Sequence, residues 1–209
     1  MLRSVYIIQF YKSEGLIKMI IKKSETKLIP AGDLSRVPTS KFDFDNINAE
    51  MLTNIMLDRM SEMGGVALSA PQVGLNMSMF VMGIEDAKIE VFNPKIISSS
   101  IETANMNEGS LTYPGVLVII KRPVSIVVEY YNKKGELQQN EFHGLTARIF
   151  QHAYDHLKGF TIKERVSDLK WKMAVKRLNN YKQKLVKKYT QKKLLDIKKA
   201  MEEQTNGNS

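Results

Sequence analysis

Two histidines four residues apart, His152 and His156, constrain this chain more than any other feature. They fall in a segment that predicts a helix from Gly144 to about residue 158, where positions four apart share a face, about 5–6 Å apart at Cβ. Leu145 and Ile149 continue the same stripe, so we expect the histidine pair to face the interior. A buried imidazole needs a partner, which favours a metal ion or a hydrogen-bonded network over a solvated surface.

The residue after the first histidine decides what chemistry such a pair can perform. In the HExxH arrangement it is a glutamate, which takes a proton from metal-bound water and passes it to the leaving group. Here it is Ala153, whose methyl group cannot carry a proton. The pair therefore indicates either a metal site without its proton carrier or a histidine pair with a structural role, and the residues alone leave both interpretations open.

The middle of the chain predicts a mixed fold dominated by short strands. An irregular segment at 28–45 precedes an amphipathic helix over about 46–63, which Gly64 and Gly65 end. β-Branched and aromatic runs follow, and residues 132–135 indicate a hairpin. The expected strands are Met77–Ile84, Glu90–Phe92, Ile96–Ser98, Val116–Ile120, Val124–Tyr131 and Glu136–Phe142.

A last long helix, expected over roughly 168–200, carries the excess positive charge of the chain. The net charge is +9, and residues 158–199 hold 15 Lys+Arg against 3 Asp+Glu, whereas residues 1–157 hold 16 against 17. Such dense basic segments bind polyanions through counterion release, although a lysine-rich face can also be merely solvated. An apolar stripe on this helix can dock on the domain. The stripe comprises Trp171, Ala174, Leu178, Tyr181, Leu185 and Tyr189.

Length and cysteine content bound the domain organisation and the compartment. The 209 residues fit one domain, placed at 19–166, followed by the basic helix at 167–200 and a disordered tail at 201–209. Residues 1–18 are expected to be an N-terminal extension, with Met19 opening the first strand, and an organellar presequence is the alternative. No apolar run reaches the length of a bilayer span and cysteine is absent, so we expect a cytoplasmic protein with no membrane partner.

Three separated segments resemble the motifs of one family. Residues 65–74 (GVALSAPQVG) resemble the GxGLAAxQxG motif of peptide deformylases, residues 108–115 (EGSLTYPG) resemble their EGCLSxPG motif, and residues 151–159 (QHAYDHLKG) resemble their QHExDHLxG motif. The order and spacing of the motifs also agree, over about residues 20–170. The resemblance implies an α+β fold with antiparallel sheets around a central HxxxH helix, to which the long basic C-terminal helix is appended.

The resemblance also implies a reaction, a cofactor and partners. Peptide deformylases hydrolyse the N-formyl group from the initiator methionine of nascent peptides, with iron, zinc or nickel held by one Cys and two His. By motif position, His152 and His156 correspond to metal ligands, whereas Gln72 and the backbone N–H of Leu111 correspond to the groups that stabilise the oxyanion. The implied partners are N-formyl-methionyl nascent peptides and, through the basic helix, the ribosome or RNA.

Two positions depart severely from these motifs. Ser110 stands at the position of the Cys ligand, and a neutral hydroxyl is a much weaker ligand than a thiolate. Ala153 stands at the position of the catalytic Glu, and general acid–base groups contribute about 10²–10⁴-fold in rate. We therefore expect the divalent metal to be weakly bound or absent and hydrolysis to be lost or strongly reduced. The alternative is an active deformylase with non-standard ligation, in which Glu108 carries protons.

Smaller features of the motifs lead to further expectations. Ala67 replaces the second glycine of the first motif and is expected to crowd the pocket or restrict the backbone. Ser110 lacks the GxSxG context of a nucleophilic serine, which favours a role as a hydrogen-bonded polar filler. Gln72 is expected to face the pocket, with the capping of a strand edge as the alternative. Asp155 is expected to pair with a base such as Arg122 and to orient the histidine helix, with a solvated helix residue as the alternative.

Overall fold

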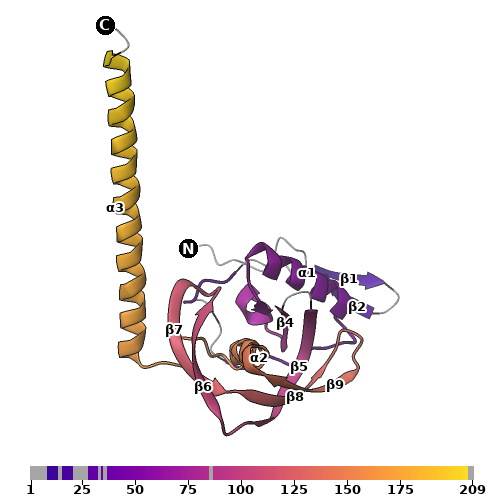
Figure 1. The fold of residues 1–209 in the computed structure, drawn as a ribbon. Helices are drawn as coiled ribbons and strands as arrows, with labels where there is room; N and C mark the ends of the chain where they lie inside the picture. The colour runs from indigo at the N-terminus through magenta and orange to yellow at the C-terminus, as the bar shows by residue number, and fades with distance from the viewer. Residues whose placement is uncertain are drawn as a thin grey trace.

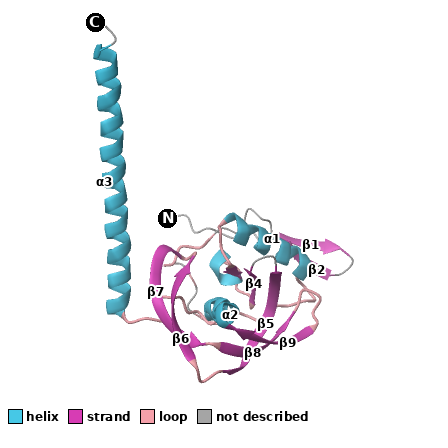
Figure 2. Cartoon of the chain, viewed as in Figure 1, coloured by secondary structure: helices cyan, strands magenta, loops and turns pink. Residues whose placement is uncertain are grey.

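A computed structural model describes the backbone of residues 9–13, 16–20, 28–32, 34, 37–84 and 87–206. It confirms the α+β class, because an uninterrupted run of strands in the middle of the chain separates the first helices from the last two (Figure 2). In chain order the elements are β1 (Gln9–Ser13), β2 (Leu16–Ile20), α1 (Ala49–Glu62), β3 (Ala67–Ser69), the 3₁₀ helix η2 (Ala70–Val73), β4 (Met79–Ile84), β5 (Ala87–Ser99), β6 (Thr103–Ser110), β7 (Tyr113–Pro123), β8 (Ser125–Tyr131), β9 (Leu137–His143), α2 (Gly144–Leu157) and α3 (Asp168–Asn206).

Antiparallel strands surround the histidine helix, as the resemblance implied. Five strands pair in the order β3-β4-β5-β8-β9, and β6 pairs with β7 in a separate two-stranded sheet. Helix α2 lies at the centre of the body, with β6 and β7 on one side and the larger sheet on the other (Figure 1). This arrangement presents one side of α2 to the core and another to β6, whose C-terminal end carries the second motif.

Strict alternation of side chains explains the sheet beneath α2. Ile126, Val128 and Tyr130 of β8 are buried and alternate with partly exposed residues, as expected for a strand with one face on the core. They pack in one cluster with Phe150 of α2. The predicted hairpin between β8 and β9 is also present, and Gly135 adopts φ +75° in its turn, a conformation that glycine tolerates without strain.

The strands differ from the prediction in several places, and the short β3 was not expected. The expected runs Glu90–Phe92 and Ile96–Ser98 belong to one strand, β5, which continues through irregular pairing with β8 between them. Strand β6 was missed, because its sequence TANMNEGS is mostly polar and only one of its residues, Glu108, is buried. Its pairing with the strongly β-branched β7 imposes the strand conformation, which is a tertiary effect that overrides local propensity.

Helix α3 leaves the body after its first turns, contrary to the expectation that its whole apolar stripe would dock. Trp171, Ala174 and Leu178 pack in a cluster with residues of β7. Tyr181 and Tyr189 are 60% and 77% exposed, because the helix has by then projected away from the sheet (Figure 1). The helix also continues to Asn206, so residues 201–206 are helical in place of the expected tail, in keeping with the helix-forming Met, Glu and Gln residues there.

The N-terminal predictions are only partly covered by the described residues. Strands β1 and β2 form an antiparallel hairpin within the segment that was expected to be an extension. The strand expected to open at Met19 is described only as far as Ile20, where β2 ends, and residues 21–27 lie outside the described part. Among the described helices, none combines the length and the apolar character needed to cross a bilayer.

Candidate active site

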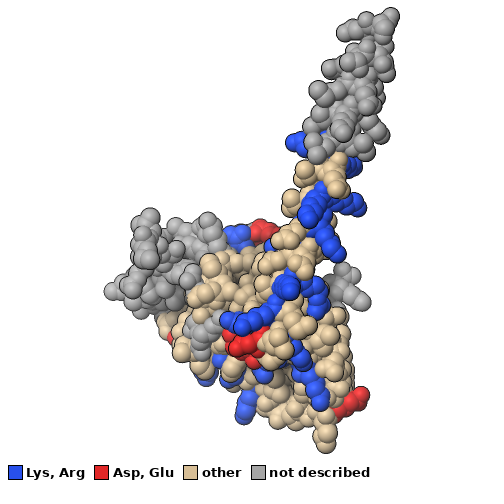
Figure 3. All heavy atoms as spheres, turned by 90° about the vertical axis from the view of Figure 1, so that its left-hand side faces the viewer, with Lys and Arg blue, Asp and Glu red and all other residues tan. Residues whose placement is uncertain are grey.

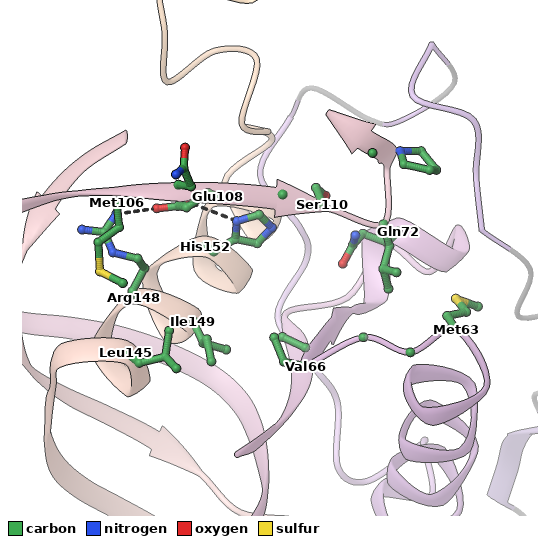
Figure 4. A pocket seen from close by; sticks show the side chains of 18 of the residues that line it. Met63, Val66, Gln72, Met106, Glu108, Ser110, Leu145, Arg148, Ile149 and His152 are labelled. Atoms are coloured by element: carbon green, nitrogen blue, oxygen red, sulfur yellow. Dashed lines mark hydrogen bonds and ion pairs between the residues drawn. The ribbon is translucent and has the colours of Figure 1, made fainter. Parts of the chain in front are cut away.

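The three motifs converge on one cavity of about 710 Å³ (Figure 4). Gly65 and Val66 reach it from the segment between α1 and β3, Gln72 from η2, and Ser110 from the end of β6. From α2, Arg148, Ile149 and His152 complete the wall beside Leu145. Leu145 was expected to face the core with the histidines, but it is 55% exposed and lies at the wall of this cavity, because the first turn of α2 is open to solvent.

Gly65 is in close contact with the second motif. A Cβ atom placed on Gly65 would lie 2.9 Å from Cδ1 of Leu111, closer than real Cβ contacts allow. The side chain of Leu111 therefore packs directly against the backbone of the first motif. This contact holds the two cavity-lining segments together although they are more than forty residues apart in sequence.

Gln72 is buried at the cavity wall with its side-chain amide fixed at both ends. Its Oε1 accepts a hydrogen bond from the backbone N–H of Ser69 at 2.9 Å, and its Nε2 donates to Oγ1 of Thr112 at 3.1 Å. The Ser69 hydroxyl in turn donates to the backbone carbonyl of Ala153 at 3.0 Å. Residues of all three motifs are thus linked by hydrogen bonds. Gln72 lines the cavity and also caps the end of the edge strand β3 through the N–H of Ser69, so both expected roles are present.

Ser110 serves as a hydrogen-bond acceptor within the same group. Its Oγ accepts the backbone N–H of Thr112 at 3.2 Å, which agrees with the expected role of a polar filler. Thr112 therefore joins Ser110 to Gln72, a role that the sequence did not indicate. Sequence reasoning could have noticed only that a hydroxyl residue two positions after Ser110 lies within a turn between paired strands.

The two histidines are brought together as predicted, and each occupies a different environment. Their ring centroids are 5.3 Å apart in an edge-to-face arrangement, and His156 is buried whereas His152 reaches the cavity. Nδ1 of His152 lies 3.1 Å from Oε2 of Glu108 (Figure 4). A hydrogen on Nδ1 satisfies this contact when the ring is neutral, which leaves the Nε2 lone pair for another partner.

Glu108 lies at the centre of a buried ion-pair network. Arg122 binds both of its carboxylate oxygens, with Nε to Oε1 at 2.6 Å and Nη2 to Oε2 at 2.9 Å, and Nη1 of Arg148 reaches Oε1 at 2.7 Å. Burial by itself raises the pKa of this carboxyl group. Hydrogen bonds from His152 and Arg122 outweigh burial, so that the pKa of Glu108 falls from 4.5 to about 2.

The same arginine ties the histidine helix to the β6–β7 sheet. Nη1 of Arg122 binds Oδ2 of Asp155 at 2.9 Å, which confirms the predicted Asp155–Arg122 pair. Asp155 also accepts hydrogen bonds from Nε and Nη2 of Arg165, which lies in the segment that leads into α3. Arg148 and Arg165 were not identified from the sequence. For Arg148 a signal existed, because it lies four residues before His152 on the same helix and so shares its face.

The donor set at the family's three ligand positions does not match a thiolate-containing metal centre. Ser110 supplies a neutral hydroxyl that already accepts a hydrogen bond, and the other two donors are imidazoles. Among the residues that the structure describes, no three His, Cys, Asp or Glu side chains form a group that could hold a metal. Without an anionic ligand, Fe²⁺, Ni²⁺ or Zn²⁺ loses the strongest of its three protein bonds.

Ala153 presents no chemistry at the position of the family's glutamate. Its side chain is 1% exposed and packs in the core cluster that contains Phe80 and Phe150. The nearest acidic residue of α2 is Asp155, which is held by two arginines. Asp155 does not line the cavity; among the described residues that do, the carboxylate is that of Glu108, which is ionised and ion-paired.

Taken together, the fold and the site define an α+β protein in which antiparallel sheets surround a helix with an HxxxH pair, with Ser110 and His152 at one cavity and Ala153 after the first histidine. The sequence model of the family described as Polypeptide deformylase matches residues 30–172. The chain therefore belongs to the peptide deformylase family.

Individual relatives cover the same part of the chain. A peptide deformylase from Thermotoga sp. (strain RQ2) is 39% identical over 141 residues, which cover 68% of this chain and 84% of that relative. Peptide deformylase 1B, chloroplastic/mitochondrial, from Arabidopsis thaliana is 36% identical over 138 residues, which cover 64% of this chain and 50% of that protein. The crystal structure of peptide deformylase from Thermotoga maritima superposes with a TM-score of 0.63 at 36% identity, covering 68% of this chain and 97% of the other.

Proposed function

We propose that this chain is a peptide deformylase homologue whose hydrolysis is lost or strongly reduced and whose cavity still binds N-formyl-methionyl peptides. The observation that carries the proposal is the buried methyl group of Ala153 at the position from which the family's glutamate delivers its proton. General acid–base groups contribute about 10²–10⁴-fold, so their loss alone removes most of the rate.

The arrangement around Glu108 argues against the alternative of an active enzyme with a substitute proton carrier. An efficient general base has a pKa near the working pH. The pKa of Glu108 is lowered to about 2, and its two oxygens are occupied by Arg122, Arg148 and His152. Protonation of this carboxylate at neutral pH would break several charge-assisted hydrogen bonds at once. These contacts and the lowered pKa support a structural role for Glu108 in this chain.

Retention of peptide binding is supported by the cavity itself. Its wall combines apolar side chains such as Val66 and Ile149 with the amide of Gln72, a combination typical of small-ligand sites. By family position, Gln72 and the N–H of Leu111 hold the formyl oxygen, and neither function needs Ala153. The hydrogen bond that Gln72 donates to Thr112 and the one that it accepts from the N–H of Ser69 keep its side chain oriented without a ligand.

A deformylase assay with saturating Fe²⁺ or Ni²⁺, combined with a binding measurement, tests this proposal. We expect negligible turnover of formyl-Met-Ala but saturable binding of the same peptide. Turnover at rates typical of enzymes, about 1–10³ s⁻¹, would establish the active alternative. The matched variant is Gln72→Ala. If the unchanged chain bound no peptide, or bound it no better than this variant, the proposal that the cavity binds peptides would be refuted.

We also propose that the exposed basic face of α3 binds ribosomes through their RNA. Lys and Arg side chains recur along the described part of this helix, which stands clear of the body (Figure 3). The exposed Tyr181 and Tyr189 lie among these lysines, and aromatic rings can stack on unpaired bases. Residues 1–157 have no excess of positive charge, so the helix is the favoured surface.

Matched sets of lysines test the role of α3. Replacing six on the helix with Gln should weaken ribosome binding and flatten the slope of log affinity against log salt by up to about 0.7–0.9 per lost phosphate contact. Replacing six lysines on the body should change the ribosome affinity and the salt slope much less. Equal effects of the two sets would contradict the proposal. The helix set is Lys182, Lys184, Lys187, Lys188, Lys192 and Lys193, and the body set is Lys41, Lys88, Lys95, Lys121, Lys133 and Lys134.

A further inference from the structure

One short segment lies between the cavity and the C-terminal helix. Residues 110–115, here called the rim segment, comprise the last residue of β6, the turn at 111–112 and the start of β7. Ser110, Leu111, Pro114 and Gly115 line the cavity, whereas Tyr113 packs in the cluster that includes the first turns of α3. The rim segment therefore faces the cavity, for which peptide binding is proposed, and contacts α3, for which RNA binding is proposed.

Helix α3 holds the rim segment at two points. The rings of Tyr113 and Trp171 meet edge to face with centroids 4.7 Å apart. A Cβ atom placed on Gly115 would lie 3.0 Å from Cδ1 of Leu178, so this side chain packs directly on the glycine backbone. Gly115 has φ +80°, a conformation that other residues adopt only with strain, and Leu178 covers it.

The opposite side of the rim segment is held by the other motifs. Leu111 packs on Gly65, and Thr112 accepts the hydrogen bond of Gln72. The segment is thus fixed between the first motif and α3, and the position of the Leu111 N–H depends on both sides. Removing one support lets a short turn relax, since few side chains hold it.

We infer that Trp171 and Leu178 are positioning residues for the cavity: by packing on Tyr113 and Gly115 they set the geometry of the rim segment and hence the affinity for a formyl-methionyl peptide. The inference rests on the proposed peptide binding. Couplings carried by packed side chains amount to about 0.5–2 kcal/mol, which corresponds to about 2–30-fold in affinity. Coupling is reciprocal, so occupation of the cavity also changes the surroundings of Trp171.

The first test measures the affinity for formyl-Met-Ala-Ser by tryptophan fluorescence. Trp171 is the single tryptophan of the chain, so the emission reports on this residue alone. Addition of the peptide should shift its emission. Leu178→Ala should weaken binding by about 2–30-fold, and Leu178→Met should restore most of the loss. The control Val186→Ala removes a 65% exposed side chain of the same helix and should leave affinity unchanged. Equal affinities of Leu178→Ala and Val186→Ala would overturn the inference.

Amide hydrogen exchange separates this inference from the proposed function, because it needs no ligand. Leu178→Ala should accelerate exchange in the rim segment but not in the β8–β9 hairpin, whereas a general loss of stability would accelerate both. Unchanged exchange in the rim segment would overturn the positioning role. If the full chain binds no formyl peptide but the local acceleration is observed, the proposed function fails and the positioning of the rim segment stands.

Discussion

Restoring the two replaced side chains should return activity only when both are present. We expect Ser110→Cys to raise metal retention with little turnover, because no proton carrier accompanies it. Adding Ala153→Glu should then raise turnover by about 10²–10⁴-fold over Ser110→Cys alone. The effects should be strongly non-additive, since ligand and proton carrier act as one unit.

The structure also predicts the effect of the repair on stability. The Ala153 side chain is 1% exposed, and a polar group buried there without a partner costs about 1–3 kcal/mol. In a chain of this size each kcal/mol shifts Tm by about 2–4 °C, so Ala153→Glu alone should lower Tm by about 2–12 °C. In the double variant, Ni²⁺ at about 100 times its Kd should restore about 2.7 kcal/mol.

Formyl-Met-Ala turnover and thermal unfolding, each measured with and without Ni²⁺, check both expectations. The matched control is Ser110→Cys with Ala153→Gln, which carries a similar volume but no titratable group. If this control turned over as fast as the variant with Ala153→Glu, the glutamate would not be the missing proton carrier. If Ser110→Cys bound Ni²⁺ no better than the unchanged chain, the argument from the lost thiolate would be refuted.

Three further predictions follow from individual contacts. The unchanged protein should retain far less than one metal ion per chain after dialysis against a mild chelator, as measured by elemental analysis, because only two neutral imidazoles and a hydroxyl are available. The pKa of Glu108 is lower in the folded state, so its contribution to the free energy of unfolding is present above pH 4.5 and is lost as the pH falls towards 2. Urea titrations at these pH values should show a decrease in the free energy of unfolding on the order of 3 kcal/mol, and the variant Glu108→Gln should lack this decrease. Gly65→Ala, but not Gly32→Ala, should weaken peptide binding, since only the first places a Cβ against Leu111.

The sequence anticipated much of the fold because its local patterns agree with the tertiary structure. The apolar periodicity before Gly64 predicted α1, and the β-branched and aromatic run at 124–131 predicted β8. Strand β6 escaped prediction because polar residues dominate it and only pairing with β7 makes it a strand. The docking of α3 was overestimated because periodicity shows that a stripe exists but not where the partner surface ends.

For the site, the sequence by itself determined which chemical groups are available. A chain without cysteine supplies no thiolate, and alanine after His152 carries no proton, whatever the fold. Helical spacing also paired His152 with His156, and the resemblance to the family's motifs paired Asp155 with Arg122.

Only the tertiary structure decided how these groups are used. It brought Arg122, Arg148 and His152 around Glu108, which turned a candidate proton carrier into an ionised structural anchor. It also placed Leu178 against Gly115, some sixty residues away in the chain. Such contacts depend on the packing of several elements in three dimensions, whereas sequence patterns encode only the spacing within one element.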